Sequence, residues 1–278
     1  MSRLQNVSIV AVTLCALLVP TTVYAASSTY ALLYFRRVTD DPFTDPGYTE
    51  SQFGTNLTSL SHTSPRGSVA RFTADATAGQ LKAFADAVNG HIGVSPGDEA
   101  WALGHVSDSF TVNGPASGTP VSITARFTVD GTLSGTGGGP ETIESQENAS
   151  IATQFTILSH NDVYSRWART EAEMSDSWIN GGGSFNVPIH RETTFDLDIV
   201  AGVPFDIYYA MDAHGGWAYG GSGGQSDFGA TGALSFDLPF GTTLNSDGGF
   251  SQSNIPEPAT AVLIGSSLFA AALRRRSR

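Results

Sequence analysis

Residues 121–129 alternate apolar and polar side chains without a break, and this pattern constrains the fold more than any other stretch of the chain. The odd-numbered positions are apolar, from Val121 to Val129, and the even-numbered positions are Ser, Thr and Arg. Successive side chains of a β-strand point to opposite faces, so the pattern predicts a strand with one buried and one solvated face. A half-buried strand needs a second layer to cover its apolar face, which favours a sandwich of two sheets.

Similar runs recur along the chain and set the expected fold class. Alternation at 195–199 and 233–238, with further candidate strands at 30–38, 69–74, 106–112, 151–158 and 203–210, predicts many short strands. Gly-rich and Pro-containing breaks separate them, and we expect Asp130-Gly131 to end the strand at 121–129 with a turn. Glycine is a poor helix former, and the chain contains 31 glycines. We predict a single all-β antiparallel β-sandwich, jelly-roll-like, spanning residues 26–244.

One internal segment fits two structures. Leu81, Phe84, Ala85 and Val88 have the i, i+3, i+4, i+7 spacing of an amphipathic helix. The same residues can instead return as the second strand of a hairpin, after a strand at 69–74 and a turn at 77–80. We favour the hairpin because it agrees with the all-β expectation, and the helix is the alternative.

The first 25 residues have the plan of a secretory signal peptide. Arg3 supplies the positive charge, residues 7–19 are mostly apolar, Pro20 follows, and Ala25 offers a small residue at which cleavage is expected. Cys15, the single cysteine, lies in the apolar region, so we expect the mature domain to contain no thiol or disulfide.

The net charge of −12 argues against a nucleic-acid partner, because such proteins neutralise phosphates with Lys and Arg.

The other end of the chain has an ordered, three-part pattern after a polar, Gly- and Ser-rich stretch at 245–254, which we expect to be a flexible linker. Pro256, Glu257 and Pro258 come first, and the apolar run 259–273 follows. Arg274, Arg275 and Arg276 then form a basic membrane stop. Fifteen apolar residues make a helix of about 22 Å, shorter than the ~30 Å hydrocarbon core, which favours a short transmembrane helix and transient membrane anchoring.

This arrangement over residues 255–278 resembles the PEP-CTERM sorting signal. The resemblance implies export by a bacterium that makes exopolysaccharide, with the signal read by an exosortase-type membrane enzyme. It also implies an inner-membrane-anchored precursor that is later found at the cell surface or outside the cell. A link to extracellular polysaccharide is part of what the resemblance implies.

Two groups of residues are candidates for binding. Asp40, Asp41 and Asp45 lie in a Pro-containing loop and are the best candidates for a Ca²⁺ site, because this ion prefers oxygen ligands. No other cofactor is expected. The aromatic residues around a Gly-rich loop could stack on sugar rings, although they could equally fill the core; they are Tyr208, Tyr209, Trp217 and Tyr219.

No pattern in the chain predicts catalysis. Asp196 and Asp198 share one face of an expected strand, and glycoside hydrolysis needs a pair of carboxyl groups. Acids spaced in this way are also the ordinary polar face of a half-buried sheet, so we expect no catalytic residues and no enzyme. The leading hypothesis is an exported, non-enzymatic surface or matrix protein associated with exopolysaccharide. A carbohydrate-binding module is the alternative, which an aromatic platform on an exposed sheet face would favour, and a secreted glycosidase is the less favoured one.

Overall fold

The computed structural model describes residues 27–37, 48–65, 67–87, 98–114, 116–136, 145–159, 166–178, 184–216 and 223–254. These residues form fourteen strands, which confirms the all-β prediction. In the described part of the chain, no helix has the length and apolar character needed to cross a membrane. The predicted signal peptide with Ala25, the motif at 256–258, the apolar run 259–273 and the arginines 274–276 lie outside the described residues.

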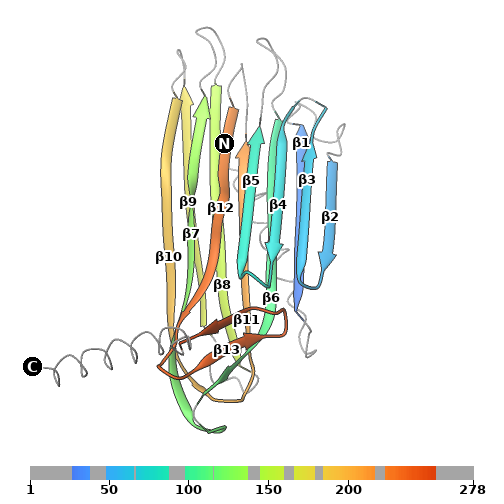
Figure 1. Cartoon of the computed structure of the whole chain (residues 1–278). Helices are drawn as coiled ribbons and strands as arrows, with labels where there is room; N and C mark the ends of the chain where they lie inside the picture. The colour runs from blue at the N-terminus through green and yellow to red at the C-terminus, as the bar shows by residue number, and fades with distance from the viewer. Residues whose placement is uncertain are drawn as a thin grey trace, which may run out of the picture.

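Two antiparallel sheets make up the sandwich, and their long strands run along its long axis (Figure 1). Sheet A contains β1 (Ser28–Arg37), β2 (Tyr48–Gly54), β6 (Asp98–Asn113), β8 (Ser145–Ser159), β9 (Arg166–Trp178), β11 (Phe205–Gly216), β13 (Thr243–Ser246) and β14 (Ser251–Ser253). Sheet B contains β3 (Leu57–Thr63), β4 (Val69–Asp75), β5 (Gln80–Ala87), β7 (Pro120–Thr136), β10 (Ser184–Val200) and β12 (Gly223–Asp237).

The chain crosses repeatedly between the sheets, so that strands far apart in sequence become neighbours. In sheet A the order is β2–β1–β6–β11–β8–β9, and in sheet B it is β10–β7–β12–β5–β4–β3. β11 therefore lies between β6 and β8, and β7 lies between β10 and β12. This interleaving agrees with the expected sandwich.

The hairpin prediction is confirmed, and the helix alternative at 81–88 is wrong. β4 pairs with β5 in antiparallel register from Val69↔Asp86 to Asp75↔Gln80. Alternate residues of both strands, including Phe72 and Leu81, are fully buried between the sheets. The helical spacing fails because tertiary pairing with β12 on the other side of β5 satisfies the backbone as a strand.

The turn expected at Asp130-Gly131 is wrong, because β7 runs through this dipeptide to Thr136. β7 is paired on both sides here, Gly131 with Ile189 of β10 and Asp130 with Thr231 of β12. β12 changes register between Asp227 and Thr231, which is the irregularity that accommodates the glycine. A Cβ added at Gly131 would lie 2.2 Å from the Phe228 ring and 2.5 Å from the Asp227 carbonyl oxygen. The glycine serves close packing rather than a turn.

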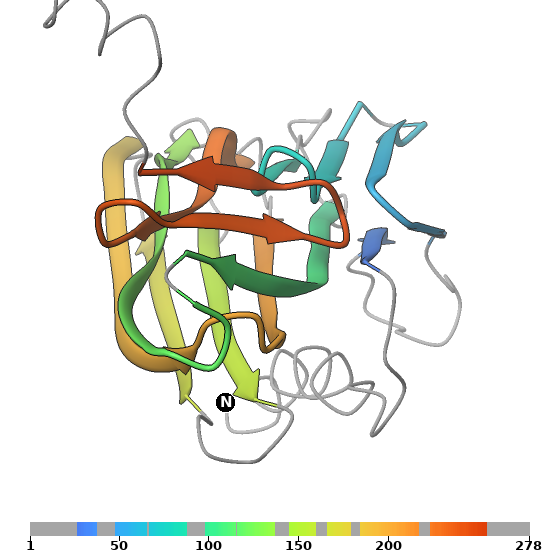
Figure 2. The same ribbon diagram turned by 60° about the horizontal axis from the view of Figure 1, so that its bottom comes forward.

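The flexible linker expected at 245–254 is also wrong, because this segment belongs to the sandwich. β13 pairs with the end of β6, and β14 pairs with β13, so that the two short strands lie across the lower end (Figure 2). Two apolar side chains explain the order: Leu244 is fully buried, and Phe250 packs 5.7 Å from Phe110 and 5.8 Å from Phe236, measured between ring centroids. The polar composition concealed these two anchors, and the folded domain extends through residue 254.

We predict that Gly131→Ala lowers the free energy of unfolding by about 1–3 kcal/mol, because the added methyl group must displace the Phe228 ring or the β12 backbone. Gly229→Ala, in the same irregular segment of β12, is the matched control, since its Cβ would meet only the Asp227 side chain, at 3.2 Å. Urea unfolding of the two variants measures the difference. Equal midpoints for both would show that Gly131 has no packing role.

Candidate functional site: the aromatic face of sheet A

The outward-facing side chains of sheet A come from alternate positions on β1, β6 and β11. On β1 the inward residues Ala31 and Leu33 are fully buried, and the residues between and beside them point outward. The outward set on these three strands, together with Phe53 of the neighbouring β2, contains a group of aromatic and histidine side chains. It forms two rows, which together we call the aromatic face; they comprise Phe53, Tyr30, His105 and Tyr208 in the first row, and Tyr34, Trp101 and His214 in the second.

The first row crosses four neighbouring strands, β2, β1, β6 and β11. Tyr30 is the Cα partner of Phe53 on one side and of His105 on the other. The ring centroids are 4.5 Å apart for Phe53 and Tyr30, 5.3 Å for Tyr30 and His105, and 4.9 Å for His105 and Tyr208. Phe53 is 75% exposed, and the other three rings are partly exposed. The row is a continuous aromatic surface open to solvent.

The second row crosses β1, β6 and β11 at the level of Trp101. Cross-strand pairing places Trp101 opposite both Tyr34 and His214. The Tyr34 and Trp101 centroids are 5.0 Å apart, and the His214 ring stacks on Trp101 at 4.3 Å with an interplanar angle of 13°. Trp101 and His105 are four residues apart on the same face of β6, so the two rows are separated by about 13 Å along the strand.

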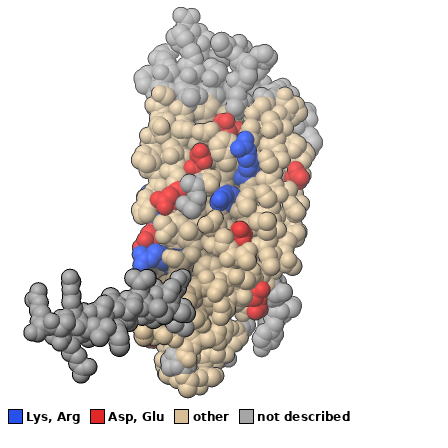
Figure 3. All heavy atoms as spheres, in the orientation of Figure 1, with Lys and Arg blue, Asp and Glu red and all other residues tan. Residues whose placement is uncertain are grey.

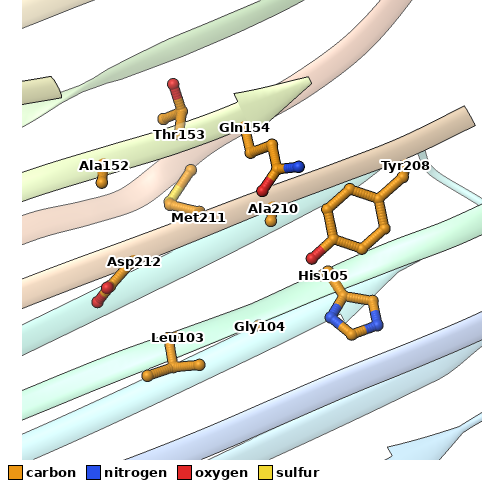
Figure 4. A pocket seen from close by; sticks show the side chains of 10 residues that line it. All are labelled: Leu103, Gly104, His105, Ala152, Thr153, Gln154, Tyr208, Ala210, Met211 and Asp212. Atoms are coloured by element: carbon orange, nitrogen blue, oxygen red, sulfur yellow. The ribbon is translucent and has the colours of Figure 1, made fainter. Parts of the chain in front are cut away.

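A small pocket lies between the rows, with a cavity volume of about 40 Å³ (Figure 4). Leu103 and Ala210 supply apolar lining, while His105 and Tyr208 belong to the first row. Further polar lining comes from Gln154 of β8 and Asp212 of β11. The volume holds a few water molecules but is too small for a sugar ring. Hydrophobic ring faces beside amide and carboxylate groups suit a ligand with both C–H and hydroxyl surface.

The histidines of the aromatic face are uncharged near neutral pH. Burial lowers the pKa of His105 to about 4 and that of His214 to about 4. The charged form is disfavoured because the imidazolium would lose its hydration against neighbouring rings. The side chains described on this face include the acids Glu99, Asp206 and Asp212, and no Lys or Arg. The rows therefore present neutral rings beside a few carboxylates.

The outer face of sheet B is chemically different, since charged groups are spread over it (Figure 3). Arg126 donates to Glu192 and to Asp237, each at 2.8 Å. The Nδ1 atom of His190 lies 2.6 Å from the Oδ1 atom of Asp130. Stacked rings are therefore found on the outer face of sheet A, and ion pairs on the outer face of sheet B.

The acids considered for glycoside hydrolysis lie on this charged face. Asp196 accepts a hydrogen bond from Thr124 at 2.7 Å, and Asp198 accepts one from Ser122 at 2.5 Å. Both acids are exposed, and their partners are the opposite residues on β7. This is the polar face of a half-buried sheet. For metal binding, the described residues contain no cluster of three or more His, Cys, Asp or Glu side chains, and Asp40, Asp41 and Asp45 lie outside them.

Of the four aromatic residues predicted as a glycan site, the structure describes Tyr208 and Tyr209, and these two point to opposite faces of sheet A. Tyr208 points outward in the first row, whereas Tyr209 is fully buried and packs 5.5 Å from Phe127, so its prediction as a glycan contact is wrong. Adjacent residues of a strand point to opposite faces, which makes joint use of this pair impossible. Burial, followed by the charges of Asp108 and Asp75, raises the pKa of Tyr209. Trp217 and Tyr219 lie outside the described residues.

Sequence reasoning missed most of the aromatic face, although a signal was present. In residues 100–105, small residues alternate with Trp101, Leu103 and His105. The small residues face inward: a Cβ added at Gly104 would lie 2.4 Å from the Phe72 ring and 2.2 Å from the Tyr30 carbonyl oxygen. When the small residues of a strand are buried and the large aromatic ones are not, the large ones have been placed outside the core.

Comparison with known proteins gives one informative match. The family profile described as the PEP-CTERM protein-sorting motif matches residues 254–276. The chain carries a PEP-CTERM sorting motif. This motif implies an exported protein that is anchored transiently in the membrane and processed by an exosortase-type membrane enzyme. The match begins at Asn254, the last described residue of the sandwich.

The other comparisons add little to the PEP-CTERM match. No curated protein matches the chain. One similar solved structure is described by the words "Structural basis for the promiscuous specificity of the carbohydrate-binding modules from the beta-sandwich super family". It is 12% identical over 75% of this chain and 84% of that chain, with a TM-score of 0.15. No conclusion about binding follows from a likeness at this TM-score.

We predict that the two histidines of the aromatic face, His105 and His214, make the protein less stable in mild acid. Their pKa values are near 4 in the folded state and near 6.5 when unfolded. The free energy of unfolding is therefore not reduced by these histidines above pH 6.5. It decreases as the pH falls toward 4, by roughly 1–3 kcal/mol for each histidine, because the unfolded state binds the protons more readily. The double variant His105→Phe/His214→Phe keeps both rings and should lose less stability than the wild type between pH 7 and pH 4.5 in urea titrations. Parallel curves for the two proteins would contradict the assignment.

Proposed function

We propose that this PEP-CTERM protein is an exported, non-enzymatic surface or matrix protein that binds extracellular polysaccharide through the aromatic face of sheet A. The observation that carries the proposal is the pair of aromatic rows on the outer side of one sheet, in which the Tyr208 and Trp101 rings are partly exposed. The sorting motif supports the destination, outside the cytoplasm, where such a ligand is found.

The chemistry of sugars matches the aromatic face. Pyranose rings expose apolar C–H groups on their faces and hydroxyl groups around their edges. The C–H groups stack on aromatic rings, while hydroxyl groups exchange hydrogen bonds with amides, carboxylates and phenols such as those of Gln154, Asp212 and Tyr208. Because the rows are about 13 Å apart, a ligand that contacts both must extend over several sugar units. A polymer lying along β6 satisfies both rows at once.

The charge of the protein favours an uncharged polymer. The chain carries a net charge of −12, and the described side chains on the aromatic face include Asp206 and Asp212 without a Lys or Arg. An acidic polysaccharide would be repelled, and its carboxylates would find no cation among these side chains. The proposal includes no catalytic activity. Asp196 and Asp198 lie on the outer face of sheet B, away from the aromatic face, and accept hydrogen bonds from hydroxyl groups of that sheet.

Affinity electrophoresis tests the proposal. We expect full-length protein in mild detergent to be retarded in gels containing neutral glucans or xylans, and to be retarded much less by alginate. Trp101→Ala and Tyr208→Ala should each weaken the apparent affinity roughly two- to tenfold, the loss expected for one stacked ring. Phe240→Ala is the matched control, since Phe240 is 77% exposed and lies outside the aromatic face.

Thermal melting of each variant shows whether the change in affinity reflects the face or the fold. Migration unaffected by every polysaccharide would reject polysaccharide binding. An equal loss of affinity in Phe240→Ala would reject the aromatic face as the binding site. Preferential retardation by alginate would reject the preference for an uncharged polymer.

A further inference from the structure

The end of the folded domain that joins the sorting motif is held by hydrogen bonds and carries no apolar side chain. Residues 251–254, which we call the latch, include β14 and Asn254, and all four side chains are exposed or partly exposed. The residue before them, Phe250, is only 8% exposed and is packed in the core beside Phe110 and Phe236. The apolar anchoring of the C-terminal segment therefore stops at Phe250.

In the latch, side-chain amides form hydrogen bonds with backbone groups that a neighbouring strand would otherwise bond. The Gln252 amide accepts a hydrogen bond from the Phe236 N–H at 3.1 Å and donates one to the Phe236 carbonyl oxygen. Asn254 donates from its side chain to the Leu238 carbonyl oxygen at 2.5 Å. Its backbone N–H donates to Thr242 at 3.0 Å, and its carbonyl oxygen accepts from Gly241 at 3.0 Å. Asn254 is thus fixed at three atoms.

This attachment leaves almost no spacer before the sorting motif. Ile255 is the one residue between Asn254 and Pro256, so the Pro256 Cα lies within about 7 Å of the Asn254 Cα. Enzymes that read linear peptides commonly bind several residues in an extended form. With the latch closed, the residues just before the motif are engaged in the sandwich and are not available for such binding.

We propose that Gln252 and Asn254 are positioning residues that control processing of the motif, and that the exosortase-type enzyme acts on the form in which the latch has opened. Opening withdraws no apolar side chain of the latch from the core, because residues 251–254 are all polar and Phe250 stays buried, while water replaces the broken hydrogen bonds. The four released residues add up to about 14 Å of reach. The proposal rests on the sorting motif and is independent of polysaccharide binding.

Pulse-chase analysis of the full chain, in a host that makes the processing enzyme, tests the latch. Gln252→Ala and Asn254→Ala should speed conversion of precursor to mature protein by about tenfold, the factor expected when one or two net hydrogen bonds are lost. Gln225→Ala, which removes a comparable surface amide contact with Ser134 on β7, is the matched control and should leave the rate unchanged.

A disulfide that keeps the latch closed tests the proposal in the opposite direction, because it should slow processing. Thr243 and Ser253 are Cα partners on β13 and β14, at a separation that a disulfide can bridge. Thr243→Cys/Ser253→Cys should slow processing by about tenfold, and inserting ten Gly and Ser residues between Asn254 and Ile255 should restore the rate in the locked protein. Unchanged processing in the locked protein would overturn the proposal. Slow processing that the spacer fails to restore would attribute the effect to the fold rather than to access.

Discussion

Close approach of the two sheets is the constraint on which the rest of this structure depends. Ala31, Ala100 and Ala102 of sheet A are fully buried, as are Ala70 and Ala85 of sheet B. Such small residues let the backbones come near each other, and at Gly104 there is no room for a Cβ against the Phe72 ring. Because these inner positions must be small in residues 100–105 of β6, the large side chains Trp101, Leu103 and His105 of that segment occupy the outer face. The packing of the core thus determines what the protein presents to solvent.

The two outer faces then differ in kind. Sheet B carries ion pairs and hydroxyl–carboxylate contacts, such as those of Arg126 and Asp196, which are solvated and contribute little to binding an uncharged ligand. Sheet A carries two aromatic rows joined through neutral histidines, with the small pocket between them. We propose that sorting brings the aromatic face to extracellular polymers, and that the latch controls when the sorting motif is processed.

Alternation predicted the sandwich because a period of two is dictated by the strand itself, as residues 121–129 and 195–199 illustrate. Alternation was a poorer guide where long-range packing determines the local structure of a segment. Asp130-Gly131 has the chemistry of a turn, yet both neighbours of β7 continue past it. The polar segment 245–254 is ordered by the apolar anchors Leu244 and Phe250 together with the hydrogen bonds of Gln252 and Asn254. The aromatic face depends on which strands become neighbours, so Tyr30, Trp101 and His214 could not be grouped before the register was known.

Oxidative footprinting of aromatic side chains tests the central claim most directly. Hydroxyl radicals modify exposed rings, and mass spectrometry reports the rate at each residue with and without a neutral polysaccharide. Our account predicts slower oxidation of Phe53, Tyr30 and Tyr208 in the presence of the polymer, and an unchanged rate at Phe240. Protection of Phe84 on the outer face of sheet B, with none at Tyr30 or Tyr208, would contradict it.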